Sequence, residues 1–246
     1  MFIRDIESTK KRGILTGIML QEHSEEMFNN LENVTPHVRL KREHFRQTPK
    51  GMRDSIAKKI VHLSAGAATL VFQQRYNHRA VVLETIASVP GMIGGLFQHL
   101  KSLRFIRDDN GWIKALLDES ENERIHLLVY SEITKPTIFE RTLIIIVQFF
   151  FCIIYGFLYL VSPKTAHRVV GYFEEEAIHS YERYLELVHE GKHENIPATV
   201  LAKSYWGLPD EARLTDIIIA TIHDEMLHRD VNHRFADDKT GTQMWH

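Results

Sequence analysis

The sequence predicts an all-α fold in which long helices pack into one bundle. From Gly51 onward the chain has the apolar pattern of helices, and the interruptions fall at Gly and Pro residues. No pair of alternating apolar segments joined by a tight turn marks a β-hairpin. A chain of 246 residues can enclose one large core, so a single helical domain over residues 51–246 is the simplest organisation.

The predicted elements follow an N-terminal arm, residues 1–50, which is polar, mixed in charge and weakly periodic. Helices are then expected at about 52–76, 79–103, 111–134, 138–161, 164–191 and 210–234. Breaker residues mark the turns between them: Pro136, Ser162-Pro163, Gly191 and residues 207–209. Pro90-Gly91 and Gly94-Gly95 interrupt the second helix, which predicts a kink there.

Residues 142–161 (TLIIIVQFFFCIIYGFLYLV) form a run of 20 residues without a charge. By length this run suits a helix that crosses a membrane. A buried helix of a large bundle, or a helix lying in one leaflet, is also apolar over such a length. Because so long an uncharged run is uncommon in soluble cores, we expect this helix to contact membrane lipid.

Two segments, residues 122–126 (NERIH) and 224–228 (DEMLH), each place a Glu three positions before a His. On a helix this spacing puts both side chains on one face, one turn apart. A carboxylate and an imidazole that converge from one helix suit a first-row metal such as iron. Two such pairs, with one further Glu from each of two other helices, form the di-iron site of ferritin-like four-helix bundles.

Candidates for the two further carboxylates lie on other predicted helices. Glu84 lies in an apolar stretch, where a charged Glu is costly unless it is paired or bound to metal. Glu174 opens a run of three glutamates, and Glu176 competes with it because Glu176 forms its own Glu-x-x-His pair with His179. The spacing leaves this choice open. It also leaves open a bundle whose buried Glu and His are paired only with each other.

Composition excludes several other classes of protein. The one cysteine, Cys152, cannot form an intramolecular disulfide or a cysteine-based zinc or iron–sulfur site. A net charge of −2 gives no indication of nucleic-acid binding. The arm shows neither an export signal nor the acid-poor character of a transit peptide.

Five segments together resemble the motifs of the alternative oxidases, which are membrane-bound, cyanide-insensitive di-iron quinol oxidases. The segments are LETIASVPGMIGG (83–95), HLKSLR (99–104), NERIHL (122–127), GYFEEEAIHSY (171–181) and DEMLHRDVNH (224–233). They occur in the family's order and spacing from about Gln73 to Asp237, which is most of the chain.

The resemblance implies six ligands around two iron ions. They are Glu84, Glu123, His126, Glu174, Glu225 and His228, so the family pattern selects Glu174 over Glu176. The resemblance also implies that Tyr181 is redox-active in catalysis. A quinol pocket beside it would be lined by Arg79, Leu83 and Ser180.

The chain departs from the family pattern in two places. Ile222-His223 stands where members often carry Arg-Ala, so a charge contact behind the metal site is missing or replaced. Ala65 and Thr69 stand where many members place an Arg and an Asp near the quinol entrance. The resemblance therefore defines the iron site more closely than the choice of quinol. The arm also lacks the regulatory cysteine of land-plant members, which argues against regulation by thiols.

The implied reaction is the oxidation of two ubiquinols and the reduction of one O2 to two waters in respiratory electron transport. The apolar helix 138–161 carries no ionisable relay, so we expect no proton pumping. Three alternatives are a plastid-type quinol oxidase, a quinone hydroxylase, and an iron-binding module without quinol turnover. The motifs NERIH and EEEAIHSY argue against the first two.

The resemblance also implies how the protein meets its membrane. Family members lie in one leaflet as homodimers, so the apolar helix is expected to be monotopic and interfacial rather than spanning. The membrane would be the bacterial cytoplasmic membrane or the mitochondrial inner membrane. The short arm without a transit peptide favours the bacterial one.

Overall fold

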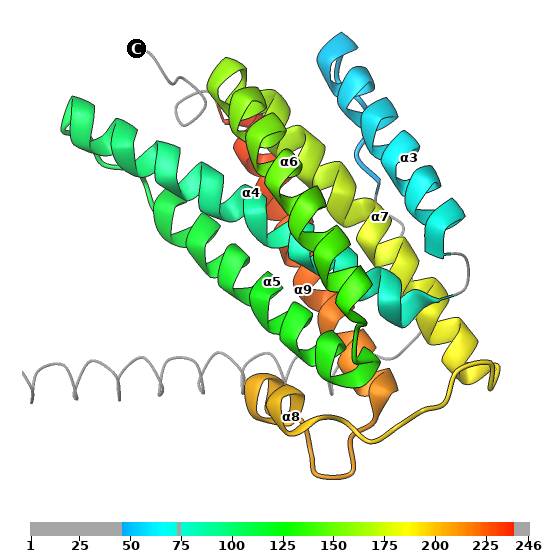
Figure 1. Ribbon diagram of the computed structural model, residues 1–246. Helices are drawn as coiled ribbons and strands as arrows, with labels where there is room; N and C mark the ends of the chain where they lie inside the picture. The colour runs from blue at the N-terminus through cyan, green and yellow to red at the C-terminus, as the bar shows by residue number, and fades with distance from the viewer. Residues whose placement is uncertain (1–45, 73–74, 239–246) are drawn as a thin grey trace, which may run out of the picture.

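The structure is a computed structural model that describes residues 46–72 and 75–238 (Figure 1). These residues form α3 (Met52–Phe72), α4 (Tyr76–Phe105), α5 (Trp112–Thr134), α6 (Ile138–Val161), α7 (Pro163–His189), α8 (Val200–Trp206) and α9 (Leu214–Asp237). The β-pairing among the described residues is a single isolated bridge between Pro197 and Arg213. The predicted all-α fold is confirmed, whereas most of the predicted arm, residues 1–45, lies outside the described part.

Helices α4, α5, α7 and α9 form the predicted four-helix bundle, with α4 packed along α5 and α7 packed along α9 (Figure 1). Apolar side chains from all four helices form its main core, in which Val129, Ile217 and Ile218 are wholly buried. Helix α3 packs against α7, and α6 packs against α4 and α7 from outside the bundle. The structure is thus a ferritin-like bundle with additional helices.

Helix α4 runs without a break from Tyr76 to Phe105, although Pro90 lies inside it. The glycines of this segment allow α4 to pack closely on α5. A Cβ atom on Gly91 would lie 2.3 Å from the carbonyl oxygen of Leu116, and one on Gly95 would lie 3.0 Å from the Leu117 side chain. A larger residue at position 91 would force the two helices apart, because it would meet helix backbone.

Helix α6 begins at a capping box. Thr137 accepts a hydrogen bond from the Glu140 N–H, and the Glu140 carboxylate accepts one from the Thr137 N–H. Both α4 and α6 are long and apolar enough to cross a membrane. In the most apolar 18-residue stretch of α6, only 17 % of the stretch is buried, whereas 56 % of the corresponding stretch of α4 is buried. Helix α6 therefore presents most of its apolar surface to its surroundings.

A short helix, α8, lies between α7 and α9, where the sequence predicted only a turn. Thr199 caps its start by accepting a hydrogen bond from the Ala202 N–H, and Gly207, with φ 62°, ends it. Seven residues are too few to show helical periodicity in the sequence. Helix α9 begins at Leu214 rather than near residue 210, because Asp216 accepts a hydrogen bond from the Arg213 N–H.

Candidate metal centre

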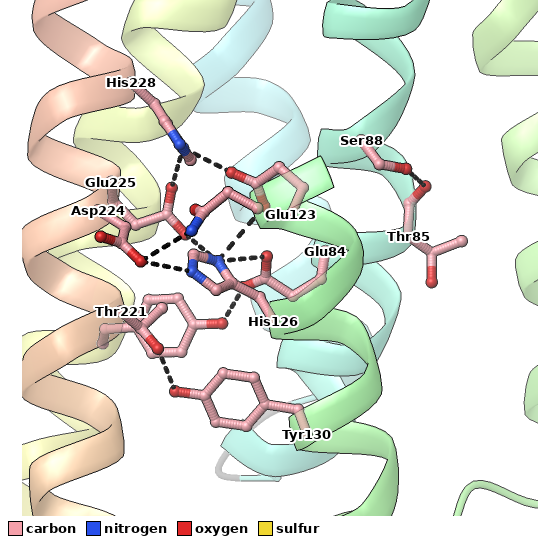
Figure 2. Close-up of polar contacts among 12 residues, drawn as sticks. Glu84, Thr85, Ser88, Glu123, His126, Tyr130, Thr221, Asp224, Glu225 and His228 are labelled. Carbon is pink, nitrogen blue, oxygen red and sulfur yellow. Dashed lines mark hydrogen bonds and ion pairs between the residues drawn. The ribbon is translucent and has the colours of Figure 1, made fainter. Parts of the chain in front are cut away.

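The six side chains predicted as metal ligands come together at the centre of the bundle. Helix α4 supplies one, α5 two, α7 one and α9 two, and the five from α4, α5 and α9 converge in Figure 2. All six are buried: Glu84, Glu123, His126, Glu174, Glu225 and His228. The most exposed of them, His228, is only 8 % exposed. Charged and ionisable groups at such depth need partners or a metal.

The ligand atoms form two overlapping groups of four. One group joins Glu84 and His126, and the other joins Glu174 and His228. Glu123 and Glu225 belong to both groups. Within each group all ligand atoms lie within 4.8 Å of one another. The two groups therefore share two carboxylates, and each group adds one carboxylate and one imidazole of its own. This is the arrangement of ligands that holds two adjacent metal ions.

The hydrogen bonding of these side chains fits a metal centre better than a self-paired core. Four buried atoms lack a hydrogen-bond partner among the described residues: Glu84 Oε2, Glu123 Oε1, Glu123 Oε2 and His126 Nδ1. His228 Nδ1 approaches Glu123 Oε1 to 2.7 Å, yet this Glu123 oxygen has no aligned hydrogen bond. Buried polar atoms are rarely left unpaired, so their lone pairs are aimed at common points where cations can bind.

A further carboxylate orients His126 from behind. Asp224 Oδ2 lies 3.2 Å from Nε2 of His126, so the other ring nitrogen, Nδ1, faces the ligand glutamates (Figure 2). Trp206 and Asn122 each donate a hydrogen bond to the same Asp224 oxygen, at 2.9 and 3.0 Å. A carboxylate that holds the outer nitrogen of a metal-binding histidine is typical of metal sites. This role of Asp224 was not predicted from the sequence, although Asp224 directly precedes the ligand Glu225.

The cluster drives the pKa values of its own groups apart. Burial, together with the charges of Glu123 and Glu225, raises the pKa values of Glu84 and Glu174 well above the usual range. Burial would also raise the pKa of Glu123, but contacts with His126 and His228 hold it well below the usual range. Strongly perturbed carboxylates in one buried cluster mark a functional site.

A cavity between α4 and α7 leads from the predicted quinol residues to the ligands. Leu83, Ser180 and Tyr181 line it, as do the ligands Glu84 and Glu174. Tyr181 lies at the junction, because it lines the cavity and its hydroxyl donates a hydrogen bond to Glu84. A ligand in the cavity would therefore contact the tyrosine that contacts the metal-binding carboxylate.

Arg79 lies near this cavity in α4 but does not line it. Its Nη1 donates a hydrogen bond to Thr69 Oγ1 at 3.1 Å, while its Nε has no hydrogen-bond partner among the described residues. Arg79 is 7 % exposed and makes no ion pair with a described residue. Burial lowers the pKa of Arg79, which records the cost of keeping this charge inside the protein.

The competing Glu-x-x-His pair on α7 does not join the cluster. Glu176 is paired instead with Arg46 at 3.6 Å and His62 at 3.4 Å. His179 has 63 % of its side chain exposed and pairs with Glu182. The geometry therefore supports Glu174 over Glu176 as the residue that joins the centre.

A family model described as "Alternative oxidase" matches residues 36–237. The chain belongs to the alternative oxidase family. It is 51 % identical over 190 residues to "Ubiquinol oxidase 2, mitochondrial" of Glycine max. It is 50 % identical over 199 residues to "Ubiquinol oxidase 1a, mitochondrial" of Arabidopsis thaliana and 49 % identical over 189 residues to "Ubiquinol oxidase, mitochondrial" of Batrachochytrium dendrobatidis.

These alternative oxidase relatives are longer than this chain. The matched regions cover 77 %, 81 % and 77 % of this chain but 57 %, 55 % and 60 % of the three relatives. The chain thus spans little more than half the length of the relatives it matches. All seven described helices fall within the part that matches the alternative oxidase family.

The two departures from the alternative oxidase pattern now have a structural setting. Ile222 is buried in the apolar core, so that position contributes no charge behind the metal site. Thr69 accepts the hydrogen bond from Arg79 through an uncharged hydroxyl. At the entrance Arg79 therefore has a neutral partner.

Proposed function

We propose that this chain is a quinol oxidase that passes electrons from ubiquinol to O2 at a non-haem di-iron centre. The observation that carries the proposal is the pair of ligand groups sharing Glu123 and Glu225, which opens onto a cavity lined by Tyr181. The names of the relatives supply the substrate class. Two ubiquinols give two quinones, and one O2 takes up the four electrons and four protons to give two waters.

The centre would be held by Glu84 and His126 on one side, by Glu174 and His228 on the other, and by the two shared glutamates between them. Four carboxylates with two imidazoles suit iron better than magnesium or calcium, which bind through oxygen alone. When bound, two irons supply reversible one-electron chemistry and a place for O2 to be reduced.

The remaining chemistry falls to the protein's own side chains. Tyr181 can deliver a proton, and an electron with it, from its hydroxyl beside Glu84. Arg79 and Ser180 would orient the quinol head by hydrogen bonds, and Leu83 would pack on its ring. The walls around the ligands are buried, which limits the escape of reactive oxygen species.

The exposed surface of α6 supports attachment to a membrane. Phe149, Phe150, Ile154 and Phe157 are each more than half exposed. Contiguous exposed apolar surface of this kind marks contact with lipid or protein. We propose that α6 lies in one leaflet as a monotopic helix, that the protein is a homodimer, and that it does not pump protons. The mitochondrial names of its relatives favour the mitochondrial inner membrane over the bacterial cytoplasmic membrane.

The proposal is tested by O2 consumption with a soluble ubiquinol in the presence of cyanide. Wild-type protein should consume one O2 for every two quinols and contain about two irons per chain. Glu123→Ala should abolish O2 uptake and lower the iron content. Glu121→Ala is the matched control, because Glu121 lies on the same helix, has 58 % of its side chain exposed and, among the described residues, forms its ion pair with Arg124. Iron uptake without quinol turnover would indicate an iron-binding protein and contradict the proposal.

A further inference from the structure

The first turn of α4, which leads into Arg79, is held by a carboxylate of α6. Oε1 of Glu140 lies 2.6 Å from Nδ1 of His78 and 3.2 Å from Nη2 of Arg75. These contacts join positions 62 and 65 residues apart, so they fix one helix on another. The side chains of His78 and Glu140 are only 19 % and 14 % exposed, so water competes little for the contact between them.

Both oxygens of the Glu140 carboxylate take part in hydrogen bonds. Oε2 accepts from the N–H and the hydroxyl of Thr137, at 2.8 and 2.9 Å, and so closes the capping box of α6. Burial would raise the pKa of Glu140, but the bonds from Thr137 and the nearby His78 hold it below its usual value. An ionised carboxylate can only accept, so His78 donates through Nδ1. One side chain therefore fixes the start of α6 and the start of α4 together.

The first turn of α4 has no such support of its own. Its N-cap residue, Arg75, makes no side-chain cap with a described residue, and residues 76–79 include no acid. Negative charge is favourable beside the N-terminus of a helix, where backbone N–H groups lack partners. Glu140 brings a carboxylate to this turn from α6. Hydrogen bonds to an ionised acceptor are roughly twice as strong as neutral ones, so the bond from His78 is a firm link between the two helices.

The turn that Glu140 holds carries Tyr76 and Arg79. Tyr76 lines the cavity that leads to the metal ligands, and its ring stacks on Tyr184 of α7 with centroids 5.9 Å apart. Arg79 lies near this cavity, and its backbone N–H donates to the carbonyl of the N-cap residue at 3.0 Å. The turn is thus fixed by α7 through Tyr76 and by α6 through His78. Loss of the α6 contact would leave Tyr76 and Arg79 free to shift with the turn.

We propose that Glu140 is a positioning residue for quinol binding, which acts through His78 on the first turn of α4. Tyr76 and Arg79 are the residues that it places. This inference rests on the proposed quinol oxidation. Neither Glu140 nor His78 lines the cavity or belongs to the ligand groups, so both act through the residues that they hold. Because Glu140 also caps α6, the contact links the helix proposed to lie in the membrane to the site that takes a membrane-borne substrate.

The test compares quinol binding and turnover in variants of His78. His78→Leu removes the donor and leaves the capping box of α6 intact, and should raise KM for a soluble ubiquinol about fivefold while kcat changes little. Kd for the matching soluble ubiquinone, measured by isothermal titration calorimetry, should rise by the same factor. His78→Asn keeps an N–H donor in the place of Nδ1 and should restore both values. His179→Leu is the matched control, because His179 also pairs with a glutamate, Glu182, but has 63 % of its side chain exposed.

A double-mutant cycle shows whether Glu140 acts through His78. Glu140→Gln keeps a side chain that can cap α6 but removes the charge, and should also raise KM. If the two residues act through one contact, the variant that combines Glu140→Gln with His78→Leu should raise KM no further than the more affected single variant. A combined effect equal to the product of the two single effects would overturn the proposal.

Two other outcomes separate this role from a purely structural one. Unchanged KM and Kd in an active His78→Leu enzyme would overturn the positioning role and leave the proposed function standing. A His78→Leu enzyme that lost iron and kcat at unchanged KM would overturn it as well, because the pair would then support only the fold. Wild-type protein that oxidised no quinol would contradict the proposed function, and the positioning role with it.

Discussion

The hydroxyl of Tyr181 on α7 donates a hydrogen bond to Oε1 of Glu84 on α4, although 97 positions separate the two residues. The Tyr181 ring stacks on Tyr130, with centroids 5.4 Å apart. The Tyr130 hydroxyl lies instead 3.1 Å from Thr221 Oγ1 (Figure 2). Of these hydroxyl hydrogen bonds of the two stacked tyrosines, that of Tyr181 reaches a proposed metal ligand and that of Tyr130 does not.

Tyr181→Phe should therefore lower the rate of quinol oxidation without unloading the centre. The variant keeps the ring and its packing but loses the hydroxyl beside Glu84, and loss of a positioned proton donor costs about 100-fold or more in rate. The measurements are kcat for O2 uptake and iron per chain. Tyr130→Phe is the control and should keep most of the activity. Equal rates in the two variants would contradict a role for the Tyr181 hydroxyl.

Thr69 gives a prediction about substrate binding rather than rate. Thr69→Val keeps the shape but removes the acceptor for Arg79 Nη1, and the lost hydrogen bond is worth about 1 kcal/mol. If Arg79 binds the quinol head, KM for quinol should rise about fivefold while kcat changes little. Thr69→Ser retains a hydroxyl and should restore the wild-type KM. An unchanged KM for quinol in Thr69→Val would contradict a role of the Thr69–Arg79 hydrogen bond in quinol binding.

The six proposed ligands could be found from the sequence, because Glu-x-x-His spacing is local and the family motifs are distinctive. The residues that support them could not. Asp224 on α9 reaches His126 on α5, and Asn122 on α5 donates a hydrogen bond to the same Asp224 oxygen. These pairings join positions about a hundred residues apart, and no local pattern records which helix faces which.

The helices show the same division between local and distant information. Breaker residues placed α5 and α6 close to their true ends. At Pro90 and Gly91 the sequence predicts a kink, but a glycine that bends a helix and a glycine that admits a neighbouring helix look alike in sequence. Only the position of Leu116 on α5 distinguishes the two cases.

Gly91→Ala should accordingly destabilise the bundle. The new methyl group would lie 2.3 Å from the Leu116 carbonyl oxygen, which belongs to a helix backbone and cannot turn away. Overpacking of this kind costs about 1–3 kcal/mol. Gly66→Ala in α3 is the control, because a Cβ there meets nothing within 4 Å and should stabilise its helix by about 0.5–1 kcal/mol. Thermal denaturation should shift in opposite directions for the two variants.

His167 predicts a loss of stability in acid that can be assigned to one residue. Burial lowers its pKa to about 4, whereas a histidine in the unfolded chain has a pKa of about 6.5. Between these values the unfolded state binds a proton that the folded state does not. The free energy of unfolding should therefore fall by up to about 1.4 kcal/mol for each pH unit as the pH drops from about 6.5 to about 4.

The His167→Gln variant should lack this contribution. Urea unfolding at pH 7 and at pH 4.5 should show a smaller loss of stability in the variant than in wild type, even if the variant is less stable at both pH values. His179→Gln is the control, because the His179 side chain is 63 % exposed, and it should retain the wild-type loss. An equal loss in wild type and His167→Gln would show that His167 is not kept neutral by its burial between Asn232 and Tyr159.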